Sequence, residues 1–150
     1  SGEAPVILMQ SEVEPVFSRL PEGYLSEALT RDWNPVVANG AVLQLLVRAC
    51  PEAKREGKRR PLRTTEEQVA WMQRQAVNNL GLDPISIGVT GSGVIRARRR
   101  QAGTIVALAA QFEGVVRVMD PGQLAAGIQR GVGHSKLLGL GMVSIKRLAV

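Results

Sequence analysis

The chain has 150 residues, of which 45% are hydrophobic and 21% are charged, enough for one packed domain or two small halves. Its net charge is +6, but residues 1–34 hold six acidic residues and two arginines, so the remainder carries +10 and favours a polyanionic partner. The single cysteine, Cys50, excludes an internal disulfide and a cysteine-based zinc cluster, and no apolar run reaches the roughly 20 residues of a membrane span. We therefore expect a protein of the reducing cytoplasm that makes no membrane contact.

The first part of the chain predicts one strand, at residues 5–9, followed by irregular chain that contains Pro15, Pro21 and Gly23. Such a strand usually lies inside a sheet, yet here it directly follows the opening Ser1. We therefore expect this sequence to be a piece of a longer protein. Its first strand would pair with another copy, or with a separate N-terminal fragment of the same protein.

The next stretch predicts a strand, a loop and a helix. Apolar and β-branched residues at 41–48 are typical of a buried strand, and the basic stretch that follows, as far as Arg63, predicts a loop. Thr64 lies three residues before Glu67, the spacing of a capping box, so a helix should begin there. Apolar residues then recur at helical spacing as far as Leu80.

The middle of the chain predicts three strands. Two short strands are expected at residues 85–89 and 94–100, and a longer one at 104–119, in which Gly114 indicates a bend or a bulge. The turn at residues 101–103 would close a hairpin between the second and third of these strands.

The last elements complete a known pattern. Asp120 has the spacing of a helix cap, the helix should end at Gly131, and a strand resumes at residues 142–145. With the two short runs between residues 85 and 100 counted as one strand, the order β-α-β-β-α-β is that of an α+β, ferredoxin-like domain. We place this domain at residues 39–150, preceded at residues 1–38 by the second half of another ferredoxin-like domain.

Two basic segments are candidate nucleic-acid contacts. Residues 48–63 carry a net charge of +5, for which a solvated loop is the alternative explanation. The strand period places Arg96, Arg98 and Arg100 on one face, roughly 6 to 7 Å apart, about the spacing of successive phosphates. The facing residues 104–111 contain no carboxylate, so either a ligand supplies the negative charge or the arginines form a salt-screened edge. The candidate RNA-binding residues are Lys58, Arg59, Arg60, Arg96, Arg98, Arg99, Arg100, His134 and Lys136.

A glycine-rich loop, GVGHSKLLGLG, follows at residues 131–141. A dinucleotide fingerprint and a Walker loop both lead from a strand into a helix, whereas this loop follows a helix, so it matches neither motif. Lys136 among glycines indicates an anion nest or simply a tight turn. His134 is a candidate RNA contact, a solvent-exposed residue or, as a lesser alternative, a catalytic base. No close pair of acidic residues predicts a metal site, and no cofactor is expected. The glycines of the loop are Gly131, Gly133, Gly139 and Gly141.

Three ordered stretches carry a family resemblance. They are VRACP at residues 47–51 with EGKR at 56–59, EQVAWMQR at 67–74, and FEG at 112–114 together with the glycine-rich loop. They resemble the CasE-type CRISPR endoribonucleases of type I-E systems. Cys50-Pro51 stands where that family has Asn-Pro.

The resemblance implies two tandem ferredoxin-like domains that bind the stem-loop of CRISPR repeat RNA. They would cleave it without metal, leaving a 2′,3′-cyclic phosphate and a 5′-hydroxyl, and retain the crRNA within Cascade, with its other subunits as partners. The arginine hairpin would enter the groove of the RNA stem. The family's catalytic histidine lies upstream of these residues, so we expect this chain alone to bind without cutting. A non-enzymatic RNA-binding or assembly module, or a small-molecule phosphate enzyme built on the glycine-rich loop, are the alternatives.

Overall fold

The computed structural model of the chain describes residues 4–148, so Ser1 and Val150, the outer limits of the two predicted domains, lie outside it. The chain divides into two units, Ser1–Asn34 and Pro35–Val150. No helix in the described part of the chain is long and apolar enough to cross a membrane.

The first unit is irregular between residues 4 and 34 except for a short 3-10 helix, η1 (Phe17–Arg19). The strand predicted at residues 5–9 is not formed, and Val6 and Ile7 are 94% and 86% exposed. A strand needs a neighbour to pair its backbone N–H and C=O groups, and no neighbour pairs with this segment among the described residues. The half domain predicted at residues 1–38 therefore stays a prediction.

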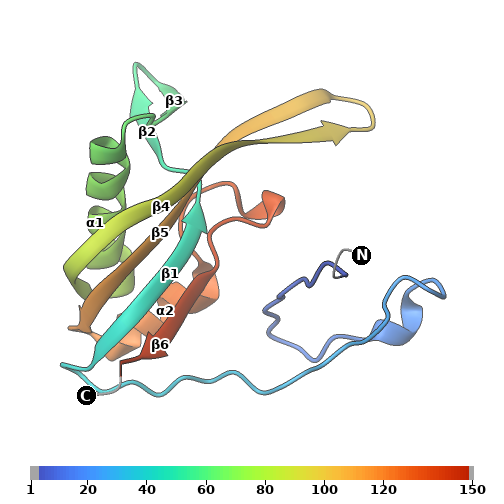
Figure 1. Ribbon diagram of the computed structural model, residues 1–150, viewed down its shortest axis with the longest axis horizontal. Helices are drawn as coiled ribbons and strands as arrows, with labels where there is room; N and C mark the ends of the chain where they lie inside the picture. The colour runs from blue at the N-terminus through green and yellow to red at the C-terminus, as the bar shows by residue number, and fades with distance from the viewer. Residues whose placement is uncertain (1–3, 149–150) are drawn as a thin grey trace. The chain divides into compact units, whose positions relative to one another are not determined.

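The second unit is built on a four-stranded antiparallel sheet, one face of which is covered by two helices (Figure 1). The strands are β1 (Val42–Ala49), β4 (Leu82–Arg99), β5 (Gly103–Val118) and β6 (Val143–Arg147), in the spatial order β4-β5-β1-β6, and the helices are α1 (Thr65–Leu80) and α2 (Pro121–Arg130). The elements follow one another as β-α-β-β-α-β, so the predicted ferredoxin-like fold is confirmed.

The core lies between the helices and one face of the sheet. On β1, alternate residues Leu43, Leu45 and Val47 are at most 1% exposed, as a strand with one buried face requires. Val47 pairs with Phe112 of β5, whose ring centroid lies 5.8 Å from that of Trp71 on α1. The strand predicted at residues 41–48 is therefore confirmed.

Both predicted helix starts are confirmed by their caps. The hydroxyl of Thr64 accepts a hydrogen bond from the amide of Glu67 at 3.2 Å, and the carboxylate of Asp120 accepts one from the amide of Gln123 at 3.0 Å. α1 ends at Leu80 and is capped by Gly81, whose φ of 61° lies in the left-handed region that glycine adopts most readily.

The two short strands predicted at residues 85–89 and 94–100 form one continuous strand, β4. The glycine-rich residues 90–93 do not interrupt it, because β5 pairs with β4 on both sides of them. A register shift between Val89 and Gly91 absorbs the irregularity, as a β-bulge does.

Gly114 is neither a bend nor a bulge, which corrects the sequence prediction. It keeps regular register with Ile87 of β4, and both register shifts of this strand pair lie on β4. A Cβ at Gly114 would collide with the carbonyl oxygen of Ser86. Glycine is required here because the backbones of β4 and β5 approach closely.

The predicted basic loop is instead a two-stranded hairpin of β2 (Glu52–Arg55) and β3 (Lys58–Pro61). The two turn residues, Glu56 and Gly57, have φ values of 51° and 76°, typical of a tight hairpin turn. Six of the eight residues in the two strands are charged, so no alternation of apolar and polar residues marked them in the sequence.

Candidate nucleic-acid interface

The β4–β5 hairpin extends beyond the rest of the sheet (Figure 1). β1 pairs with β5 only as far as Ala49 and Ala110, whereas β4 and β5 stay paired as far as Arg99 and Gly103. The two strands therefore form a projecting ribbon over residues 92–110, termed the arm. A two-stranded arm has the width to enter a nucleic-acid groove.

The arm distributes its arginines differently from the prediction. Arg96 and Arg98 lie on one face of β4, whereas Arg99 lies on the opposite face and Arg100 lies in the turn. The predicted row of three is therefore a pair, because the strand ends at Arg99. All four arginines are exposed.

No carboxylate neutralises the arm within residues 4–148. The ion pairs in this part of the chain join Arg55 to Glu67 and Arg117 to Asp83. The arm therefore projects into solvent with unbalanced positive charge, the condition that favours binding to a polyanion.

The other face of the arm packs on the glycine-rich loop through a second apolar cluster. Its buried members are Cys50, Ala107, Ala109 and Leu140, and the half-buried Ile95 and Leu138 pack against them. Sequence reasoning treated the two leucines as part of a loop and missed this anchor. The contact fixes the loop at the base of the arm.

Glycines in the loop serve the turn itself. A Cβ at Gly131 would lie 2.8 Å from the carbonyl oxygen of Gly141, and one at Gly141 would collide with the carbonyl oxygen of Val132. The amide of Val132 donates to Gly141 at 2.8 Å, and the amide of Gly141 donates to Arg48 at 2.7 Å. These two amides are used inside the protein, so the glycines at the ends of the loop serve a tight turn, and the anion nest around Lys136 stays a prediction.

The β2–β3 hairpin places cations directly opposite one another. Lys54 pairs across the strands with Arg59, and Arg55 pairs with Lys58. Like charges in facing positions destabilise a hairpin unless an anion lies nearby. Arg55 has such a partner in Glu67. The exposed cations of this hairpin that have no such partner among the described residues are Lys54, Lys58, Arg59 and Arg60.

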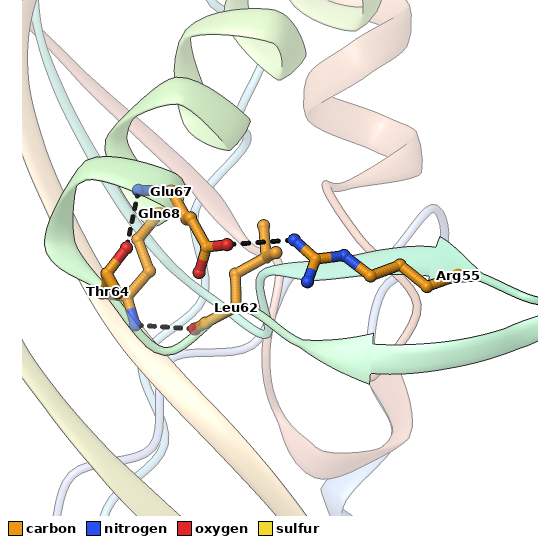
Figure 2. A network of polar contacts seen from close by, with 5 residues as sticks. All are labelled: Arg55, Leu62, Thr64, Glu67 and Gln68. Carbon is orange, nitrogen blue, oxygen red and sulfur yellow. Dashed lines mark hydrogen bonds and ion pairs between the residues drawn. The ribbon is translucent and has the colours of Figure 1, made fainter.

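A polar network holds this hairpin to the start of α1, as Figure 2 shows. Nη2 of Arg55 donates to Oε1 of Glu67 at 3.0 Å, and Nε2 of the buried Gln68 donates to the carbonyl oxygen of Leu62 at 2.9 Å. The backbone amide of Thr64, and then Arg55, lower the pKa of Glu67. The basic hairpin is therefore oriented by the capped end of a helix.

A pocket of about 300 Å³ lies between α1, the end of α2 and the glycine-rich loop. Its lining includes Trp71, Gln75, Asn79, Arg130, His134 and Lys136. The pocket brings together two predicted site residues, His134 and Lys136, with Arg130, which sequence reasoning did not identify as a site residue. No hydrogen bond orients the His134 ring among residues 4–148, as a general base would require.

Comparisons with known proteins agree with this geometry. A family model described as CRISPR associated protein matches residues 1–147. The CRISPR-associated endoribonuclease Cse3 of Thermus thermophilus is 36% identical over 158 residues, which cover 95% of this chain and 74% of that protein. A structure of Thermus thermophilus Cse3 bound to an RNA representing a pre-cleavage complex is 31% identical, with a TM-score of 0.81 over 90% of this chain and 68% of that one. Cas6e from Escherichia coli str. K-12 is 26% identical, with a TM-score of 0.56 over 79% of this chain and 66% of that one.

Proposed function

This chain belongs to the family of CRISPR-associated proteins, and from that premise we propose that it binds the stem-loop of CRISPR repeat RNA and serves in the processing of CRISPR transcripts. The observation that carries the proposal is the arm, whose exposed arginines have no carboxylate partner among residues 4–148. The likeness of the chain to an RNA-bound relative at 31% identity supports RNA as the polyanion that binds the arm.

The arm makes the principal contact with the RNA. Arg96 and Arg98, two residues apart on one strand face, are separated by roughly 6 to 7 Å and meet successive phosphates. The open end of a short stem admits the arm more readily than a long A-form groove does. The β2–β3 hairpin, through Lys58, Arg59 and Arg60, and the loop residues His134 and Lys136 add further contacts to the RNA.

The processing step follows the chemistry of the family. A ribose 2′-hydroxyl attacks the adjacent phosphate, which leaves a 2′,3′-cyclic phosphate on one fragment and a 5′-hydroxyl on the other. We assign His134 a role in RNA contact and none in this step, because no hydrogen bond orients its ring among the described residues. The bound product then joins the other Cascade subunits in the cytoplasm.

The test is a binding titration followed by product analysis. The chain should bind a repeat stem-loop more tightly than an unstructured RNA of the same composition, in EDTA as well as in magnesium. Equal affinity for the two RNAs would overturn the proposal. A module that binds RNA without taking part in cleavage has the same surface, and it would yield no 2′,3′-cyclic phosphate even within an assembled Cascade.

A further inference from the structure

The pocket beside α1 has a polar wall. Phosphate binding by the arm does not involve this wall. Gln75 and Asn79 lie one turn apart on α1, both half-buried, and Nδ2 of Asn79 donates a hydrogen bond to Oε1 of Gln75. This bond leaves Nε2 of Gln75 as a donor and Oδ1 of Asn79 as an acceptor, and neither atom has a hydrogen-bond partner within residues 4–148. The wall thus presents a donor and an acceptor side by side.

The rest of the pocket places two cations, Arg130 and Lys136, and one carboxylate, Glu52, around an aromatic residue. The thiol of Cys50 donates a hydrogen bond to Glu52 at 3.4 Å. Nη2 of Arg130 donates to the carbonyl oxygen of Asn79 at 3.0 Å, which holds the guanidinium at the rim, and Lys136 lines the same pocket. Trp71, only 6% exposed, contributes an apolar part of the lining. A volume of about 300 Å³ is at the small end of ligand pockets and suits one nucleotide rather than a duplex.

We propose that this pocket binds one unpaired nucleotide of the RNA, adjoining the stem held by the arm; the inference rests on the proposed function. Each RNA base carries a hydrogen-bond donor beside an acceptor on its Watson–Crick edge, which complements the amides of Gln75 and Asn79. The nucleotide's phosphate meets Arg130 and Lys136. A paired base cannot bind in this way, because its Watson–Crick edge is already occupied.

The apolar cluster connects the arm to the pocket, so both can contact one RNA molecule. Leu138 and Leu140 fix the glycine-rich loop against Ile95 and Ala107 of the arm, and the same loop contributes Lys136 to the pocket. An RNA strand that leaves the arm can therefore continue along the glycine-rich loop to the pocket.

The experiment uses two RNA probes and two matched variants of the full chain. The probes are one repeat stem-loop with flush ends, and the same stem-loop with a single unpaired nucleotide at the 5′ or the 3′ end. Gln75→Met removes the donor at similar length, whereas Gln73→Met makes the same change at an exposed position of α1 outside the pocket. Both variants are first compared with the parent chain by thermal unfolding.

The parent chain should bind one of the tailed RNAs more tightly than the flush one, and Gln75→Met should lose about fivefold in affinity for that RNA alone. Gln73→Met should bind both as the parent does. Equal affinity of the parent chain for flush and tailed RNAs overturns the pocket proposal and leaves the proposed function intact, whereas failure to bind either RNA overturns both.

A second readout needs no variant. With 2-aminopurine as the unpaired nucleotide, its emission should change when the parent chain binds, because the base leaves water for a pocket lined by Trp71. An unchanged emission at both RNA ends, under conditions where the stem is bound, would also overturn the pocket proposal.

Discussion

Nη2 of Arg55 lies 3.0 Å from Oε1 of Glu67, so a side chain of the basic β2–β3 hairpin meets a carboxylate in the first turn of helix α1 (Figure 2). Both side chains are substantially exposed, at 62% and 38%, so water screens the pair and its contribution to stability is small. The ion pair acts on orientation, because it holds the β2–β3 hairpin, with its facing cations, against a rigid helix.

Replacing Glu67 with Gln should weaken RNA binding about two- to fivefold, the range set by one exposed ion pair. The hairpin loses its orientation but no phosphate contact, so the slope of log affinity against log salt should stay the same. Fluorescence anisotropy at several salt concentrations measures both quantities. Glu66→Gln, one residue earlier on α1, is the control and should leave affinity unchanged; a changed slope in Glu67→Gln would contradict the positioning role.

The stability contribution of Glu67 should depend on pH with a definite sign. The backbone amide of Thr64, and then Arg55, lower the pKa of this carboxyl below its ordinary value of 4.5, so folding favours the ionised form. That contribution is present above pH 4.5 and is lost as the pH falls through the lowered pKa. Urea unfolding midpoints of the parent chain and Glu67→Gln should therefore differ near pH 7 and converge toward pH 3; a gap that widens in acid would refute this.

Replacing Arg98 with Ala should reduce RNA affinity and flatten its salt dependence by about one counterion, because one phosphate contact is lost. The same change at Arg74, an exposed arginine of α1 that lies outside the arm, is the matched control. Equal slopes for Arg98→Ala and the parent chain would show that this face of the arm does not touch the RNA backbone.

Replacing Gly114 with Ala should destabilise the second unit by about 1 to 3 kcal/mol, because its Cβ would collide with the backbone of Ser86. Gly88→Ala, on the neighbouring strand, meets no atom within 4 Å and should change the free energy of unfolding by less than about 0.5 kcal/mol. Chemical denaturation distinguishes them. If the free energy of unfolding changed equally little in both variants, the backbone at Ser86 would have moved to make room for the added Cβ.

Cys50 should react slowly with iodoacetamide in the folded chain at pH 8. Burial raises the pKa of its thiol above the ordinary 9.0, and the side chain is only 3% exposed, so little thiolate is available. In urea the same thiol should react at the rate of a free cysteine, as mass spectrometry over time would show. Rapid labelling of the folded chain would mean that the apolar cluster beneath the arm opens readily.

The β-α-β-β-α-β order of the main sheet and its two helices, both helix caps and the buried strand β1 were predictable because each depends on local spacing. Thr64 and Glu67 form a cap within one turn, and the alternation of Leu43, Leu45 and Val47 belongs to a single strand. The arginines of the arm were likewise visible as a group of charges without facing acids.

The sequence by itself therefore determined the helices, the order of the strands in the main sheet and which segments carry the charge. Only the tertiary structure decided which charges share a surface: Arg100 falls into a turn, Arg55 meets a helix twelve residues onward, and Gln75 and Arg130 line one pocket from different helices. The reason is physical. Caps and strand periods act between near neighbours, whereas sheet pairing and the packing of helices join segments whose distance apart in the chain leaves no local pattern.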